Sequence, residues 1–232
     1  MSNTFHQQVL HEDNHTLVIN KHSGQLVQGD KTKDKSIIDL AKFYLKEKYN
    51  KPGEVFCGLV HRLDRPTSGV LVLARTSKAL SRLSEQFKGR EVQKVYWAIV
   101  ERKPKEKEGT LINFLKKNEK QNKSYVYDKE VNGSKRAELD YKLLASSEKY
   151  HLLELTLKTG RHHQIRVQLS HIGCIIKGDL KYGAKRSNKD ASISLHARKL
   201  SFTHPTTKEQ VLTVAPVPQD NLWQFFEKEV KV

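Results

Sequence analysis

The sequence predicts an α+β (mixed α/β) fold with a largely antiparallel sheet and flanking helices. Segments with strand and helix character are intermixed along the 232 residues. Two strand-like segments, 137–145 and 151–158, are separated only by turn residues, which is typical of an antiparallel hairpin. Because no repeat, low-complexity segment or change of composition marks a linker, we expect a single domain.

The N-terminal part of the chain predicts one strand and one helix. The apolar run at 17–19 indicates a short buried strand, and the turn residues of 20–24 follow it. Ser36 and Asp39 have the spacing of a capping box, and apolar residues then recur at helical spacing. We therefore expect a helix over about 37–49.

The next segments predict a central strand, a helix and a second strand. Residues 70–74 form a continuous apolar run that is too short for a buried helix. Leucine and phenylalanine at helical spacing then predict a basic amphipathic helix ending near Gly89. Residues 94–100 have strand composition, and the period of two places Lys94 and Tyr96 on one face.

The second half of the chain contains one predicted loop and several further elements. Residues 101–109 are nearly all charged residues and proline, which predicts a surface loop. After the hairpin, the pattern indicates three elements: a helix ending at Gly173, a strand over 192–202, and a C-terminal helix over about 220–230 capped by Asp220.

Composition points to a polyanionic partner. The chain has 42 Lys and Arg against 26 Asp and Glu, a net charge of +16. Its 37% hydrophobic content is too high for a disordered basic tail. Without an apolar run long enough for a membrane span or signal peptide, we expect a soluble, cytoplasmic protein. Cys57 and Cys174 are expected to be buried free thiols.

Three polar segments adjoin the predicted strand ends: 61–69, 94–96 and 159–166. In the first, the single carboxylate of Asp64 lies between Arg62 and Arg65, a setting that keeps an acid ionised. From these residues alone, a loop held by an ion pair is the favoured interpretation, and a catalytic acid is the alternative.

The third polar segment gathers cationic and imidazole side chains at the start of a predicted helix, where backbone N–H groups favour anions. Its members are Arg161, His162, His163 and Arg166. Phosphate contact is one interpretation. A zinc site is disfavoured, because adjacent histidines cannot readily turn both rings to one ion and no third ligand is near.

Taken together, these segments closely resemble the RNA pseudouridine synthases, in the RluA-type branch with HRLD followed by TSG. The matching segments, in order, are HRLDRPTSGVLVLART (61–76), KVYWAIV (94–100), TGRHHQIRVQLSHIG (159–173) and GDLKYG (178–183). NKHSG (20–24) and LHARKLSFTHP (195–205) match the flanking segments, although His22 stands where the family usually has proline.

The resemblance covers about 9–218 and implies one pseudouridine synthase catalytic domain over 1–232, with a catalytic cleft and the C-terminal helix at about 220–230. No S4 domain is expected, because the first 16 residues are too few to form one. The implied activity is isomerisation of specific uridines in structured ribosomal or transfer RNA by base flipping. We expect RNA as the partner, no metal, no cofactor, no membrane association, and a monomer.

The resemblance also assigns catalytic roles. Asp64 is the catalytic carboxylate, acting as a nucleophile or as the base that starts elimination. Tyr96 lies against the flipped uracil, where stacking contributes about 1 to 3 kcal/mol. Arg166 pairs with Asp64, and Arg62 fills the space that the flipped base leaves.

The expected RNA contacts are Arg62, Arg65, Lys94, Arg161, His163, Lys185 and Arg186. Segments 61–90 and 177–199 each contain seven Lys or Arg against two acids, a net +5, and are the expected RNA-facing surfaces. A metal-dependent nuclease would need several converging acids, whereas the polar segments contain only Asp64. A non-catalytic RNA-binding module would explain the charge but not an acid among RNA-facing arginines.

Overall fold

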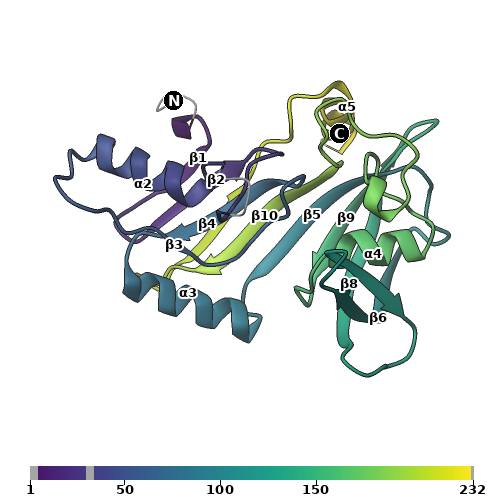
Figure 1. Ribbon diagram of the computed structural model, residues 1–232. Helices are drawn as coiled ribbons and strands as arrows, with labels where there is room; N and C mark the ends of the chain where they lie inside the picture. The colour runs from purple at the N-terminus through teal and green to yellow at the C-terminus, as the bar shows by residue number, and fades with distance from the viewer. Residues whose placement is uncertain (1–4, 30–33, 231–232) are drawn as a thin grey trace. The chain divides into compact units, whose positions relative to one another are not determined.

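The computed structural model describes residues 5–29 and 34–230 of the chain (Figure 1). It comprises two compact units. Unit 1 contains Met1–Gln93 and Ala197–Pro216, and unit 2 contains Lys94–His196 and Val217–Val232. Both units combine β-sheet with helices, so the predicted α+β class is confirmed.

The sheet of unit 1 brings the segment after Lys21 beside the segment before Val70. Its strands are β1 (Val9–Glu12), β2 (Thr16–Lys21), β4 (Ser68–Ala74) and β10 (Leu195–Thr203, from Ala197 in this unit), in that order. β11 (Gln210–Val214) pairs with β10, and β3 (Gly58–Leu59) with β4. β2 and β4 run antiparallel, with Lys21 opposite Gly69. The predicted strands at 17–19 and 70–74 are confirmed.

Among the described residues, two longer helices accompany this sheet, and their ends follow from local sequence. α2 (Ile37–Lys48) begins with the predicted capping box: Ser36 Oγ accepts the Asp39 N–H, and the Asp39 carboxylate accepts the Ser36 N–H. α3 (Ser77–Gly89) is followed by Arg90 in the left-handed region, with φ +63°. Both predicted helices are confirmed.

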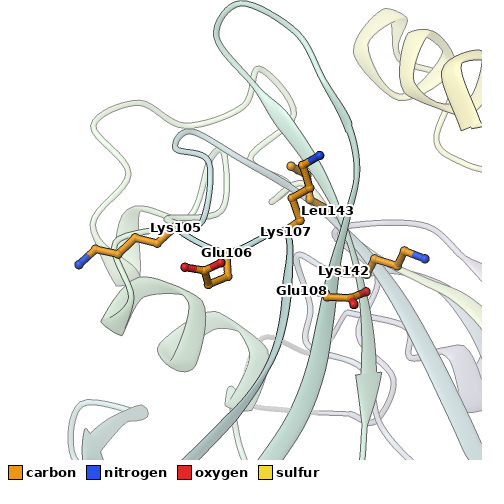
Figure 2. A pocket seen from close by; sticks show the side chains of 6 residues that line it. All are labelled: Lys105, Glu106, Lys107, Glu108, Lys142 and Leu143. Atoms are coloured by element: carbon orange, nitrogen blue, oxygen red, sulfur yellow. The ribbon is translucent and has the colours of Figure 1, made fainter.

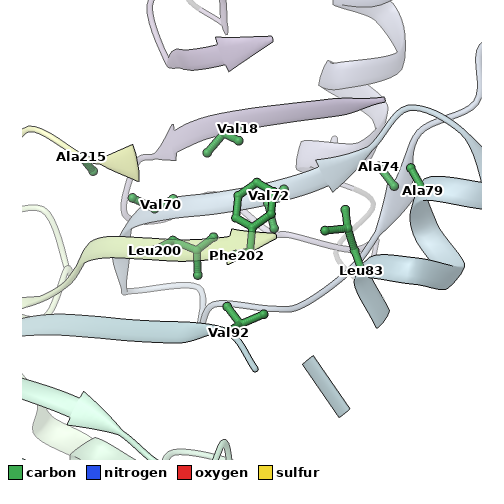
Figure 3. Packing of buried hydrophobic residues seen from close by; sticks show 10 residues of the cluster. All are labelled: Val18, Val70, Val72, Ala74, Ala79, Leu83, Val92, Leu200, Phe202 and Ala215. Carbon is green, nitrogen blue, oxygen red and sulfur yellow. The ribbon is translucent and has the colours of Figure 1, made fainter. Parts of the chain in front are cut away.

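The core of unit 1 forms between β4 and α3 (Figure 3). Every residue of β4 is buried, as the uninterrupted apolar run predicts for a central strand. Val70 and Val72 project to one side of the strand, where Leu83 of α3 and Phe202 of β10 pack in the same cluster. This packing fixes the strand that directly follows the loop carrying Asp64.

The sheet of unit 2 is antiparallel throughout. Its strands, in order, are β5 (Gln93–Val100, from Lys94 in this unit), β9 (His151–Leu157), β8 (Lys135–Ser146), β6 (Glu108–Asn118) and β7 (Lys123–Tyr127). The predicted strand at 94–100 and the predicted hairpin are confirmed. Strands β6 and β7 are not anticipated by the sequence analysis, and the predicted loop at 101–109 gives way to β6 at Glu108.

Helices cover this sheet at two places. α4 (Gln164–His171) contacts β6 and β7, and its Val167 packs with Leu115, Ala137 and Tyr182. α5 (Asn221–Val230) contacts β8, and its Trp223 and Phe226 pack with residues of β5 and β9.

Local signals also account for the ends of these elements. Gly173, with φ +77°, follows α4 as predicted, and the Asp220 carboxylate accepts the Leu222 N–H at the start of α5. The strand predicted at 192–202 begins later, at Leu195. Leu180–Tyr182 forms a short 3-10 helix. Cys57 and Cys174 are buried free thiols, as predicted.

Gly69 should tolerate no side chain. Its φ is +115°, and a Cβ built there would lie 2.3 Å from the Ala197 carbonyl oxygen. Gly24 also has a positive φ, +83°, but nothing lies within 4 Å of its Cβ position. We expect Gly69→Ala to lower the free energy of unfolding by about 3 kcal/mol or more, and Gly24→Ala by only about 1 kcal/mol. Urea unfolding of both variants measures the difference, and equal losses would show that the close approach to Ala197 is not rigid.

Candidate active site and nucleic-acid surfaces

Asp64 lies in a loop that is anchored to the core of unit 1 on both sides. Before it, the His61 ring accepts the N–H of Val72 at 3.1 Å and stacks on Phe87 at 4.5 Å. After it, the Asp64 carbonyl accepts the Thr67 N–H at 3.0 Å and closes a turn. Asp64 itself is partly exposed, so a fixed backbone presents a carboxylate that solvent can reach.

A buried lysine also holds this turn, through hydrogen bonds to its backbone. Lys21, the last residue of β2, is fully buried at 0% exposure. Its ammonium donates to three backbone carbonyls: Thr67 at 2.7 Å, His22 at 2.9 Å and Arg65 at 3.2 Å. Each of the three N–H bonds of the protonated group has an acceptor, which is the condition for burying such a group. We call this arrangement the Lys21 clamp.

The turn after β2 also binds the Asp64 loop directly. The Gly24 N–H donates to the Arg65 carbonyl at 2.8 Å, and Arg65 Nε donates back to the Gly24 carbonyl at 3.0 Å. His22 replaces the family's usual proline without loss to the clamp, because only its carbonyl is used. Its N–H donates to Gln25 Oε1 at 2.9 Å, a bond that proline could not make.

Electrostatics link Lys21 to Asp64. Burial lowers the pKa of Lys21 to about 7, while the negative charge of Asp64 opposes this shift and the positive charge of Arg65 adds to it. The sequence analysis does not single out Lys21. The available signal was a lysine at the end of an otherwise apolar strand in NKHSG.

The two arginines beside Asp64 differ in their surroundings. Both side chains are exposed. Arg65 donates Nη2 to Asp34 at 2.9 Å in addition to its bond to Gly24, so it helps to hold the loop. For both residues, contact with RNA stays a prediction.

In unit 2, β5 carries Tyr96 and Lys94 as predicted. Tyr96 is buried and stands opposite Leu155 of β9. Lys94 reaches the third polar segment, because a Cβ built on Gly160 would lie 3.8 Å from its Nζ. The structure therefore brings two of the three polar segments together within this unit.

Arg166 is held by a buried acid of the GDLKYG segment. Its Nε donates to Asp179 Oδ2 at 2.7 Å and its Nη2 to Asp179 Oδ1 at 2.8 Å, and both side chains are almost fully buried. The guanidinium also lies over the Tyr182 ring, 5.1 Å from its centre. Neither Asp179 nor Tyr182 is among the site residues that the sequence predicts, although GDLKYG contains both. The pairing of Arg166 with Asp64 stays a prediction.

Tyr182 connects Arg166 to the two histidines. Its hydroxyl lies 2.8 Å from His163 Nδ1 and accepts the Ser124 N–H at 2.9 Å. His163 is buried, has φ +54° at the start of α4, and stacks on His162 with 3.8 Å between ring centres. These contacts give His163 a position in the interior of unit 2, and its predicted contact with RNA stays untested.

The remaining predicted RNA contacts lie at the surface of unit 2. Arg161 donates Nε to the Arg136 carbonyl at 3.0 Å. Lys185 and Arg186 are exposed and line a cavity of about 310 Å³ together with Lys177 and Tyr150, and with Glu101 as its one acid. This cavity combines cations with an aromatic ring, a combination that suits nucleic acid.

A second cavity of unit 2 has a different character (Figure 2). It measures about 620 Å³, lies between the 101–107 loop and β8, and is lined by Lys105, Glu106, Lys107, Glu108, Lys142 and Leu143. Its charges alternate in sign, which does not favour a polyanion. It contains none of the predicted site residues.

Two kinds of feature are absent from the described residues of these units. Across 5–29 and 34–230, no three His, Cys, Asp or Glu side chains are grouped so as to hold a metal ion. Within the same residues, no helix has both the length and the apolar character needed to span a membrane.

Comparisons with known proteins identify the family. The family model described as RNA pseudouridylate synthase matches residues 15–171. A relative from Bacillus subtilis, the uncharacterized RNA pseudouridine synthase YhcT, is 36% identical over 91% of this chain and 69% of its own length. The ribosomal large subunit pseudouridine synthase C of Buchnera aphidicola is 37% identical over 90% of this chain and 67% of its length.

A solved structure agrees with these matches. Human RNA pseudouridylate synthase domain containing 4 superposes with a TM-score of 0.82 and 26% identity, covering 99% of this chain and 95% of the human one. Among three of the curated relatives, the chain spans between 52% and 71% of their length.

Fold and sequence together therefore define an enzyme class, the isomerases that convert uridine in RNA to pseudouridine. The chain belongs to the RNA pseudouridine synthases, in the RluA-type branch that its HRLD and TSG motifs indicate. The predicted family, fold and enzyme class are confirmed.

The Lys21 clamp predicts a pH dependence of stability. In the unfolded chain Lys21 keeps its proton up to its ordinary pKa of 10.5, whereas in the folded chain it loses the proton near pH 7. Since the unfolded state binds more protons between these values, rising pH favours the folded state. We expect the unfolding free energy of the parent, relative to Lys21→Met, to rise between pH 7 and 10 by up to about 1.4 kcal/mol per pH unit.

Lys46→Met, at an exposed lysine of α2, is the matched control and should show no such rise. Urea unfolding at several pH values measures all three proteins. A parent-to-variant difference that stays constant from pH 7 to 10 would show that Lys21 keeps an ordinary pKa in the folded protein.

Proposed function

We propose that this chain isomerises specific uridines in structured ribosomal or transfer RNA, using Asp64 as its single catalytic carboxylate and no metal or cofactor. Membership in the family supports the reaction. Two relatives bear ribosomal names, the large subunit pseudouridine synthases C of Buchnera aphidicola and D of Zymomonas mobilis. The observation that carries the assignment of Asp64 is its place in a loop that hydrogen bonds of Lys21 and His61 anchor on both sides.

The reaction needs one ionised acid. The N1–C1′ bond of the uridine breaks, the uracil turns and C5 bonds to C1′. The hydrogen on C5 then leaves as a proton, and N1 takes up a proton from solvent, so the composition of the RNA is unchanged. Asp64 acts either as the nucleophile or as the base that starts elimination, and both roles require its ionised form. Lys21 is close enough to Asp64 for their charges to interact, and its clamp fixes the turn that carries the carboxylate.

Arg166 and Tyr96 complete the proposed chemistry. A guanidinium has five N–H donors, and Asp179 engages two of them. We assign Arg166 as the partner of Asp64 in the reacting complex, with Asp179 fixing the plane of the guanidinium. Tyr96 is assigned as the ring that lies against the flipped uracil.

Arg62 is assigned to the space that the flipped base leaves. Extruding a base from folded RNA costs a few kcal/mol of stacking. An exposed guanidinium two residues before the acid is flat and can both stack and hydrogen-bond in that space. The side chain that fills this space therefore comes from the same loop as the proposed catalytic carboxylate.

The proposed phosphate contacts extend over both units. They are Arg65, Lys94, Arg161, His163, Lys185 and Arg186. We further propose that the two units act as one catalytic domain, that the protein works as a monomer, and that it is cytoplasmic, where ribosomal and transfer RNA are found. The net charge of +16 supports a polyanionic substrate.

Asp64→Asn should abolish pseudouridine formation and leave RNA binding within a few-fold of the parent. The change keeps the shape of the side chain and removes one negative charge from a cationic surface. Nucleoside mass spectrometry after cyanoethylation measures conversion, and fluorescence anisotropy measures binding.

Glu85→Gln removes the same charge from an exposed position of α3, within the same basic segment, and should convert at the parent rate. Conversion by Asp64→Asn at even a tenth of the parent rate would remove Asp64 from its assigned role. Binding without conversion by the parent, tested on total cellular RNA, would support a non-catalytic RNA-binding module instead.

The salt dependence of RNA affinity should show whether Lys185 and Arg186 contact phosphates. Each phosphate contact contributes about −0.7 to −0.9 to the slope of log K against log salt concentration. Replacing both residues with Gln should therefore make the slope shallower by about one or two units. Lys42→Gln with Lys46→Gln, which removes two charges from α2, should leave the slope unchanged. An unchanged slope in the first variant would place the RNA elsewhere.

A further inference from the structure

The outer face of the β6–β7 hairpin carries exposed aromatic rings. β7 is the last strand in the sheet of unit 2 and therefore an edge strand. Its residues alternate: Ser124 is buried and Val126 partly buried on the α4 side, whereas Tyr125 and Tyr127 are each 38% exposed. Lys123 shares their face by the two-residue period.

The strand register adds further rings and cations to this face. Lys116 stands opposite Tyr125, and Phe114 stands opposite Tyr127. On the next strand, Arg136 stands opposite Phe114 and forms an ion pair with Glu138 at 2.5 Å. Three aromatic residues and three cationic residues thus share one surface, which we call the hairpin platform.

Packing against other parts of the chain does not explain why these rings lie at the surface. In the part of the chain that the structure describes, neither Tyr125 nor Tyr127 stacks on another aromatic ring. The contacts of Tyr125 are polar: Lys123 Nζ lies 5.7 Å from the centre of its ring and 5.2 Å from that of Tyr182, and the Tyr125 hydroxyl donates to Gln121 Oε1. Exposed aromatic residues on an edge strand invite aggregation, which makes them costly unless they bind something.

Charge complementarity points to nucleic acid as the occupant. Residues 114–136 hold seven Lys or Arg against three acids, a net +4. Of the acids, Glu119 is paired with Lys117 and Asp128 with His171. An anionic ligand would therefore find Lys116 and Lys123 flanking the rings.

We propose that the hairpin platform binds unpaired nucleotides of the substrate RNA by stacking their bases on Tyr125 and Tyr127, with Lys116 and Lys123 neutralising the adjacent phosphates. This inference rests on the proposed function in so far as RNA is the substrate. Tyr125 and Tyr127 are two residues apart on a strand, a spacing of about 7 Å, so each ring can receive a separate base of an extended strand.

This mode of binding selects single-stranded segments and no particular sequence. Every base has a face that can stack, whereas paired bases are already stacked within a helix. The platform occupies the face of β6 and β7 opposite the one that α4 covers. It would therefore hold a loop or a flanking single strand of the substrate rather than the reacting uridine.

The test compares three variants of the full chain, two with double and one with a single substitution. For each, binding to an RNA stem–loop is compared with binding to the blunt-ended duplex of its stem. Tyr125→Ala with Tyr127→Ala removes both rings, and Tyr125→Phe with Tyr127→Phe keeps them. Phe225→Ala, at a ring of α5 that is 41% exposed, is the matched control. Anisotropy measures affinity, and the fluorescence of 2-aminopurine placed in the loop reports stacking.

We expect the Ala pair to weaken stem–loop binding at least tenfold and to abolish the 2-aminopurine quenching, while duplex binding changes less than twofold. Losing two stacked bases implies a loss of about thirtyfold or more, so tenfold is a conservative threshold. The Phe pair and Phe225→Ala should bind like the parent. Unchanged stem–loop affinity in the Ala pair, or an equal loss in the Phe pair, would overturn the proposal.

A second variant keeps the test decisive if the Ala pair unfolds. Lys116→Gln with Lys123→Gln should make the salt slope shallower by one or two units, and an unchanged slope would overturn the platform. Uridine conversion by the parent is measured in parallel. If the parent converts uridine but the platform variants bind RNA like the parent, only this inference is refuted. If the parent does not convert uridine but the platform variants lose RNA binding as expected, the proposed activity is refuted and the RNA-binding surface is retained.

Discussion

The ammonium group of Lys21 is the contact on which the Asp64 loop depends. It binds carbonyls that lie 44 and 46 residues further along the chain, at Arg65 and Thr67, and so joins the end of one buried strand to the turn that precedes another. Three hydrogen bonds offset part of the cost of burying a cation. The remaining cost appears as the lowered pKa of the group.

Unit 2 also buries a cationic side chain, but its partner is a carboxylate instead of backbone carbonyls. The Arg166 guanidinium is buried against Asp179 in a two-point contact and lies over the Tyr182 ring. A buried ion pair adds little net stability compared with apolar packing, but it fixes orientation, because breaking it would leave a charge uncompensated. In each unit, a buried cation thus fixes the geometry of a segment that the family resemblance marks as functional.

Local signals explain which elements could be predicted from the sequence. The Ser36–Asp39 box, the apolar run of β4 and the glycine after α4 each act over a few residues, and the corresponding elements form as expected. β6 and β7 escaped prediction because only one face of each is buried. Their other face carries lysine and tyrosine in a pattern that resembles a polar loop.

Prediction of the site residues from the sequence is also limited to short local patterns. The HRLD, KVY and RHHQIR segments predict Asp64, Tyr96 and Arg166 from short patterns. Lys21 and Asp179 went unrecognised because their roles depend on partners far along the chain or in another segment. A charged residue at the end of an apolar strand, as in NKHSG, or next to a turn glycine, as in GDLKYG, is the signal that would have found them.

The central claim is that the chain moves the C1′ bond of uridine from N1 to C5, and the hydrogen on C5 reports this step directly. RNA transcribed with [5-³H]uridine is incubated with the full chain, and tritium released to water is counted beside the pseudouridine formed. The account predicts one tritium released for each pseudouridine, with the mass of the unlabelled RNA unchanged. Pseudouridine-free RNA with its tritium retained, or uracil released into solution, would contradict it.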